Sequence, residues 1–223
     1  MAIDPLDEKL RKDLIAIGNE ISNLWVHHDL FWRMTELTNK NERVMQVGGD
    51  YLAWFKNCYI EAGSVAFRRQ LDRDKRSISM VNFLSEIHKN HRYFSREGFQ
   101  RKRTFSPGSH FHDARVWKEA GETFDQTFGS GGQLNPDIVQ ADIDLLEKEG
   151  TAIREQVNKE IAHRDRKGMQ GAKATGEIFE QCLEHLDGLA SKYSLLLYRE
   201  AFQTLRPKYM FDVEEVFTFA WKV

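Results

Sequence analysis

The sequence has little proline, little cysteine and no long uncharged run, and each shortage narrows the class of protein. Its four prolines, Pro5, Pro107, Pro136 and Pro207, stand at the edges of long segments. No stretch approaches the ~20 consecutive apolar residues of a membrane-spanning helix, and the first residues lack the basic-then-apolar order of a signal peptide. Two cysteines are too few for a disulfide scaffold. We therefore expect a reduced, cytoplasmic protein that does not enter a membrane.

An excess of one charge is also lacking. The chain has 32 basic and 34 acidic residues and a formal net charge of −2. A nucleic-acid-binding role must therefore rest on a local basic patch. A composition of 41% hydrophobic and 30% charged residues among 223 is that of a globular chain. Since no linker divides it, we expect a single domain over residues 1–223.

No segment alternates in the manner of a β-strand, whereas apolar residues recur at three- and four-residue steps. This spacing predicts an all-α helical bundle, with four to five core helices and extra helices. The predicted helices cover residues 5–40, a span that starts near 50, a unit at 77–90 capped by Ser77, and residues 113–128, 137–163 and 175–205. We expect an irregular basic insert at 92–111. Both cysteines, Cys58 and Cys182, are expected in the core.

The aromatic tail, residues 208–223, has two interpretations. Asp212, with Glu215 three residues later, has the spacing of a capping box and predicts a short helix. An extended segment that docks Phe217, Phe219 and Trp221 fits the same residues equally well.

The stretch at residues 154–168, REQVNKEIAHRDRKG, combines a histidine with dense charge. At about 100° per residue, His163 lies roughly 120° from the apolar stripe of its own helix, so it does not belong to that helix's core face. One interpretation is a solvated helix end whose basic residues complement the helix dipole. The other is a site that handles phosphate.

Two segments carry a resemblance to a known family. NKEIAHRDRK resembles the signature helix end of the HEPN superfamily of small all-α proteins. YIEAGSVAFRRQLDRDKRSISMVNFLSEI is similar to the abortive-infection, AbiU-type HEPN branch, in the run Arg68, Arg69, Asp72, Ser77 and Ser79. The resemblance implies a homodimeric bundle that cleaves RNA without a metal or another cofactor. It also implies a cognate antitoxin or a nucleotidyltransferase-like protein as partner.

The resemblance implies His163 as the acid and base, and Arg154 or Arg164 as the phosphate clamp. Imidazole titrates near neutral pH and can transfer the proton of a 2′-hydroxyl. A guanidinium stays charged and binds phosphate oxygens in a fork. The substrate-binding candidates around this pair are Lys159, Asp165, Arg166 and Arg69.

The spacing of this motif departs from the family pattern. The position separated from His163 by six residues, 157–162, is Gln156 and not an arginine, and none of those six residues is an arginine either. The nearest upstream arginine is Arg154. Arg154 is nine positions from His163, or roughly 13 Å along a helix, which is long for two groups of one chain acting on one phosphate. Two functions therefore compete: an RNA-cleaving toxin or phage-defence effector, and a non-catalytic module that binds RNA, a nucleotide or a protein.

Three further groups have a structural and a functional interpretation. Arg69 falls on the apolar stripe of its helix, which favours a buried ion pair over a substrate contact, and Asp72 is spaced to pair with Arg76. SREGFQRKRTF interleaves basic and aromatic residues, as in single-strand binders, but a loop anchored by its phenylalanines is favoured. The paired histidines lack further ligands at recognised spacing, so no metal site is predicted.

Overall fold

The computed structural model describes residues 4–104, 114–157, 176–198 and 200–208. These residues form helices and, apart from one isolated bridge between Ser95 and Gln133, no β-structure. The predicted all-α bundle is confirmed. Within the same residues, no helix is long and apolar enough to cross a bilayer.

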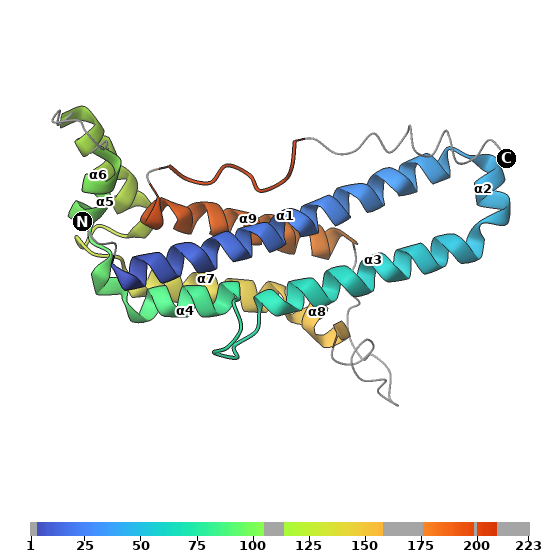
Figure 1. Cartoon of the computed structure of the whole chain (residues 1–223), viewed down its shortest axis with the longest axis horizontal. Helices are drawn as coiled ribbons and strands as arrows, with labels where there is room; N and C mark the ends of the chain where they lie inside the picture. Colours follow the sequence, from blue (N-terminus) through green and yellow to red (C-terminus); the bar gives the residue numbers. More distant parts are fainter. Residues whose placement is uncertain (1–3, 105–113, 158–175, 199, 209–223) are drawn as a thin grey trace.

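A long helical hairpin is the spine of the molecule (Figure 1). Helix α1 (Pro5–Asn39) and helix α3 (Gly49–Gln70) are joined at one end by the short helix α2 (Glu42–Val47). Helix α9 (Gly176–Leu197) packs along α1 as far as Trp32. Helix α4 (Met80–Lys89) extends the line of α3 and packs on α7 (Pro136–Glu149), while α8 (Thr151–Gln156) lies on α3.

The helix starts predicted at residues 5 and 137 are confirmed to within one residue, and each lies at a proline. Asp4 caps α1 by accepting a hydrogen bond from the Leu6 amide at 2.8 Å, just before Pro5. Asn135 accepts one from the Asp137 amide at 2.9 Å, just before Pro136. Proline suits the first helical position because its missing N–H would have no intrahelical partner there.

The core is a continuous cluster rich in aromatic side chains. It joins residues of α1, α3, α4, α5, α6, α7, α8 and α9. Its largest fully buried side chains include Phe67, Phe124, Phe128 and Tyr193. The Tyr193 hydroxyl donates to Asp142 at 2.6 Å, which satisfies its polar end inside the bundle.

The predicted irregular insert is wrong for residues 96–104, which form helix α5 (Arg96–Thr104) after the short helix η1 (His91–Tyr93). Helix α5 packs against α6 (Ala114–Phe128) at one end of the bundle. The anchored interpretation of this stretch is confirmed as far as residue 104, because Phe94 and Phe99 are buried. Lys102 donates to Asp7 at 2.8 Å, so its charge is paired within the protein. Residues 105–111 of the insert lie outside the described residues.

Three predicted boundaries are also corrected. Helix α9 ends at Leu197, not at residue 205, and the described residues from 200 onward are not helical. The N-cap of α4 is Ser79, whose hydroxyl accepts from the Asn82 amide at 3.1 Å, and not Ser77. The helix expected over 137–163 breaks after Glu149.

Cys182 is buried as predicted, but Cys58 is exposed. The neighbouring Tyr59 packs on Phe179 of α9, whereas Cys58 lies at an open cavity lined by α1 and α3 residues such as His27. The spacing of apolar residues is the same on a helix face that packs in the core and on one that stays exposed, so the sequence pattern does not distinguish them.

Candidate functional site

The break after Glu149 sets the direction of α8. Gly150 sits against α3, where an added Cβ would meet the Leu71 side chain and lie 3.0 Å from the Phe67 ring. Next to it, the Thr151 hydroxyl donates back to the Glu147 carbonyl at 2.8 Å, a bond that bends helices. Glycine therefore permits a close approach, and α8 leaves the axis of α7 against the surface of α3.

Arg154 lies in the last turn of α8 and is half-buried. Its neighbours on the core side, Ile153 and Val157, are 0% and 3% exposed, so the turn is anchored. The apolar stripe predicted for residues 137–163 is confirmed as far as Val157, since Val139, Ile143 and Leu146 are buried as well. The other candidates of the motif, Lys159, His163, Arg164, Asp165 and Arg166, lie outside the described residues.

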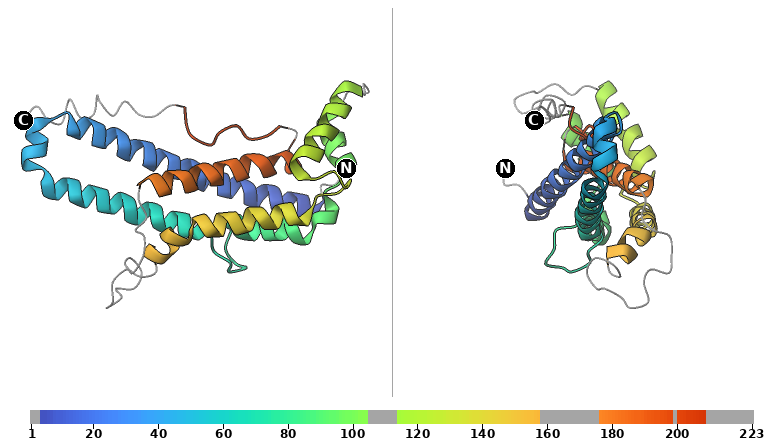
Figure 2. Two further views of the ribbon diagram at one scale, coloured as in Figure 1. Left: turned by 180° about the vertical axis from the view of Figure 1, so that it is seen from behind. Right: turned by 90° about the vertical axis from the view of Figure 1, so that its right-hand side faces the viewer.

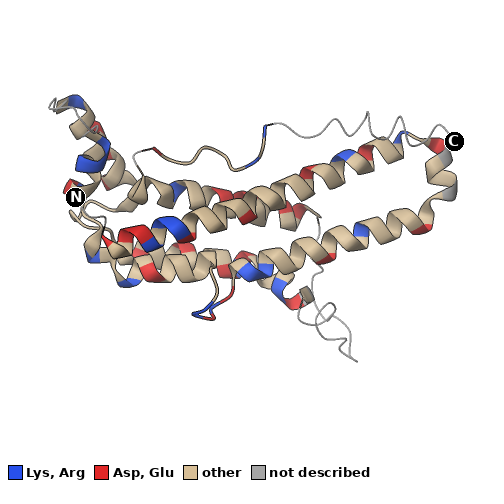
Figure 3. Ribbon diagram, viewed as in Figure 1, with Lys and Arg blue, Asp and Glu red and all other residues tan. Residues whose placement is uncertain are grey.

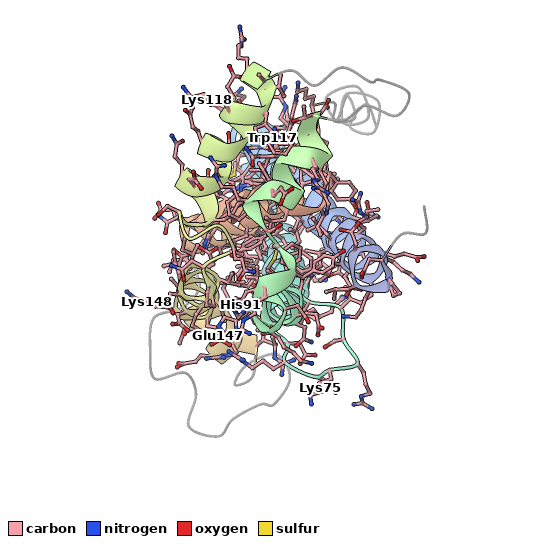
Figure 4. The ribbon with its side chains drawn as sticks, turned by 90° about the vertical axis from the view of Figure 1, so that its left-hand side faces the viewer. Lys75, His91, Trp117, Lys118, Glu147 and Lys148 are labelled. Atoms are coloured by element: carbon pink, nitrogen blue, oxygen red, sulfur yellow. The ribbon has the colours of Figure 1, made fainter. Side chains whose placement is uncertain are left out.

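A cavity of about 440 Å³ opens between α8 and α9, next to Arg154's helix. Its walls combine a cation, carboxylates, an amide and a hydroxyl with a few apolar groups. They are formed by Lys148, Glu149, Thr151, Ala152, Glu155, Ile178, Gln181 and Cys182. Figure 4 shows Glu147 and Lys148 on the same side of the bundle as Lys75, while Trp117 and Lys118 lie on α6.

The loop between α3 and α4 contains the serine-rich run and lies beside α7. Arg73 in this loop donates to Glu147 at 2.7 Å. The Ser79 hydroxyl donates to the Asp72 carbonyl at 2.6 Å, and the Ser77 hydroxyl to the Asp74 carbonyl at 2.7 Å. Both serines of the run therefore hold the loop closed.

The place of Arg69 on the apolar stripe predicted a buried side chain, and this prediction is wrong. Its side chain is 61% exposed and pairs with Glu20 at 3.4 Å. The predicted pair of Asp72 with Arg76 is wrong as well, because Arg76 donates to Asp74 at 2.6 Å. Asp72 instead accepts the Asp74 amide at 3.0 Å, which turns the chain too tightly for a helical i,i+4 pair.

A sequence model of the HEPN family described as AbiU2 matches residues 7–216, nearly the whole chain. The chain belongs to this abortive-infection HEPN family. The matched range includes both segments that carried the resemblance. The sequence matches no curated protein and no solved structure.

One pair that sequence reasoning missed in this AbiU2 chain is His185 with Glu149. The Nδ1 atom of His185 on α9 lies 2.6 Å from a carboxylate oxygen of Glu149 at the end of α7. A carboxylate at Nδ1 fixes the ring orientation and leaves Nε2 for proton transfer. No local motif joins residues 36 positions apart; the only signal was the helical spacing of His185 from Cys182.

Cys182, although it lines the cavity, is not a nucleophile of this AbiU2 chain. Burial raises the pKa of its thiol to about 12, and its Sγ donates to the Glu149 carbonyl at 3.6 Å. A thiol in this state stays protonated at neutral pH. Among the described residues, no group of histidine, cysteine and acidic side chains is placed to hold a metal ion.

Proposed function

We propose that this AbiU2-family protein is a metal-independent endoribonuclease of an abortive-infection system. The observation that carries the proposal is the family match over residues 7–216, which includes the Ala-His motif. The fold supports it in one respect: α8 presents Arg154 in an anchored turn immediately before the motif residues.

In this proposal His163 takes the proton of a 2′-hydroxyl and returns it to the leaving oxygen. Arg154 or Arg164 forks onto the phosphate and stabilises its developing charge. A homodimer supplies two copies of each group from one short motif. Lys159, Asp165 and Arg166 line the same cleft, while the exposed Arg69, already paired with Glu20, contributes at its edge.

A second candidate is a non-catalytic HEPN module that binds RNA, a nucleotide or a protein partner such as an antitoxin. The observation that favours it is the position of the arginine. Arg154 stands nine positions before His163, and α8 ends two residues after Arg154. An arginine so far from the histidine acts on the same phosphate only if the intervening chain or a second copy brings them together.

The deciding experiment is cleavage of a mixed, structured RNA pool by purified protein in excess chelator. We expect cleavage that survives the chelator. His163→Ala should reduce its rate by about 10²- to 10⁴-fold, because a positioned acid or base contributes that much. Arg154→Ala should reduce it by about 10²- to 10³-fold if this residue is the clamp.

Arg101→Ala is a matched control for the loss of one surface charge. Arg101 lies on α5, 66% exposed, and pairs only with its helical neighbour Glu97 in the ion pairs of the described chain. Its replacement should leave cleavage unchanged. If the unmodified protein binds RNA without cutting it, the non-catalytic module replaces the nuclease; if cleavage persists in His163→Ala, the assignment of His163 is wrong.

A further inference from the structure

The segment that follows α9 runs along α1 toward the far end of the hairpin. Near its start, the Tyr198 hydroxyl donates to the Arg11 carbonyl at 3.2 Å. Near its end, Arg206 Nε donates to Asp29 at 2.9 Å. These two points of α1 are about 27 Å apart along the helix axis. The segment covers that distance at roughly 3 Å per residue, which is the rise of an extended chain.

This path is fixed from both sides. On α9, the Ser191 hydroxyl donates to the Phe202 carbonyl at 2.6 Å, and Asp187 accepts the Leu205 amide at 2.9 Å. On α1, the Leu205 and Phe202 side chains lie over Gly18, in ordinary van der Waals range of the place its Cβ would take. The direction of the chain as it passes Arg206 is therefore set by specific contacts.

The same face of α1 next presents an exposed tryptophan. Trp32 comes nearly one turn after Asp29 and is 45% exposed. Helix α9 begins at Gly176, where an added Cβ would lie 3.0 Å from the Trp32 ring. Beyond this level, only α1, α2 and α3 of the described chain remain, and the hairpin projects past the other helices (Figure 2).

From Trp32 a row of touching rings crosses the projecting part of the hairpin. Trp32 contacts Phe31, which stacks on Phe55, with ring centroids 5.5 Å apart in both pairs. Phe55 stacks on Tyr51 at 6.3 Å, and Tyr51 lies 6.1 Å from Trp54. We name the exposed rings of this row, Trp32, Tyr51 and Trp54, together with the exposed Met45 of α2, the distal aromatic patch; these four side chains are 43–61% exposed.

An exposed apolar patch of this kind marks a surface that binds another part of the chain or a partner molecule. Its charge pattern is no barrier, since the projecting ribbon is largely uncharged apart from scattered residues of both signs (Figure 3). The described chain arrives beside it, already extended, and 15 residues follow Lys208: YMFDVEEVFTFAWKV.

We propose that residues 209–223 cover the distal aromatic patch, first at Trp32 and then across the hairpin tip. From Asp29 to the end of α1 at Asn39 is about 15 Å, whereas the segment can span up to about 50 Å. It therefore has the length to pass the tip and reach Tyr51 and Trp54. Its aromatic residues provide apolar side chains that can pack on the patch. This proposal does not depend on whether the protein cuts RNA.

The five tryptophans allow a direct test in the full chain. We would label the protein with 5-fluorotryptophan, assign each ¹⁹F signal by Trp→Phe variants, and compare spectra in H₂O and D₂O. In a bare patch, Trp32 and Trp54 would keep about the 45% and 61% of the unfolded-chain shift that their exposed fractions give, whereas covered rings should keep much less. Shifts at or above those fractions would show that the patch is bare and overturn the proposal.

Two double variants then identify the occupant. Phe217→Ser with Phe219→Ser should raise the isotope shifts of Trp32 and Trp54 and leave Trp117, on α6 at the other end, unchanged. Glu214→Gln with Glu215→Gln, in the same segment, should change none of them. If the aromatic variant leaves Trp32 and Trp54 protected, or if protection in the unmodified chain is lost on dilution together with a halving of mass, another occupant covers the patch and the proposal fails.

Discussion

At the scale of residues, buried polar groups set what the bundle tolerates. Gln70 is fully buried at the end of α3 and joins three elements. Its amide oxygen accepts the Met80 amide of α4 at 3.1 Å, and its amide nitrogen donates to Glu20 of α1. The neighbouring Arg69 uses the same carboxylate but from the surface. We therefore expect burial, rather than formal charge, to decide how much each side chain contributes to the free energy of unfolding.

We predict that Gln70→Ala lowers the free energy of unfolding by about 1–3 kcal/mol, because it leaves the Met80 amide buried without its partner. Arg69→Ala should cost at most about 1 kcal/mol, as expected of an exposed pair. Urea denaturation followed by circular dichroism measures both. Equal losses in the two variants would contradict this ranking.

His28 should make stability depend on pH. It is 1% exposed, with Nδ1 2.8 Å from the Tyr59 hydroxyl and Nε2 3.5 Å from Glu180. Burial lowers the pKa of His28 below 6.5, helped by Arg206 and opposed by Glu180 and Asp29. The unfolded chain then binds a proton that the folded chain does not. The contribution of His28 is complete above the unfolded pKa and is lost as the pH falls toward the folded one.

We therefore expect the free energy of unfolding to decrease between about pH 7.5 and pH 5.5, and His28→Gln to flatten that decrease. The measurement is a series of urea titrations across this range for both proteins. The other histidines are present in both proteins and cancel in the comparison. An identical slope in the variant would rule out His28 as its source.

At the scale of elements, the joint between α7 and α8 positions the candidate site. Gly150 lets α8 fold onto α3, and Arg154 follows one turn later, with its amide donating to the Gly150 carbonyl at 2.9 Å. The backbone of Gly150 is αR, so its φ does not require glycine. The close approach of α3 does.

Gly150→Ala should consequently lower the free energy of unfolding by about 1–3 kcal/mol through overpacking against Leu71 and Phe67. If Arg154 acts in RNA cleavage, the same variant should reduce the rate by displacing α8. Gly131→Ala is the control, since an added Cβ there meets nothing within 4 Å. A Gly150→Ala protein as stable as the control would mean that α3 and α8 adjust without cost.

At the scale of the whole molecule, one core joins the elements on which the site and the α5–α6 pair depend. Buried residues of α1, α4, α7 and α9 belong to the same cluster as those of α5 and α6. Lys102 of α5 binds Asp7 near the start of α1, and also the Leu196 carbonyl near the end of α9. Helix α5 is thereby tied to the start of α1 and to the end of α9.

We predict a single cooperative unfolding transition, since no described part of the core stands apart from the rest. The midpoints of urea unfolding should coincide for far-ultraviolet circular dichroism and for the ¹⁹F signal of Trp117 on α6. An earlier midpoint for Trp117 would divide the α5–α6 pair from the bundle and contradict a single domain.

Local chemistry in the sequence determined most of the helices, the starts of α1 and α7 and the core stripe through Val157, and short motifs indicated the AbiU2 HEPN family. These depend on periodicity, capping and motif order, which neighbours in sequence define. Only the tertiary structure decided where a helix bends, which stripe stays exposed and which distant groups meet. The kink at Gly150, the exposed Cys58 and the pair of His185 with Glu149 depend on what packs alongside, and a single sequence does not contain that information.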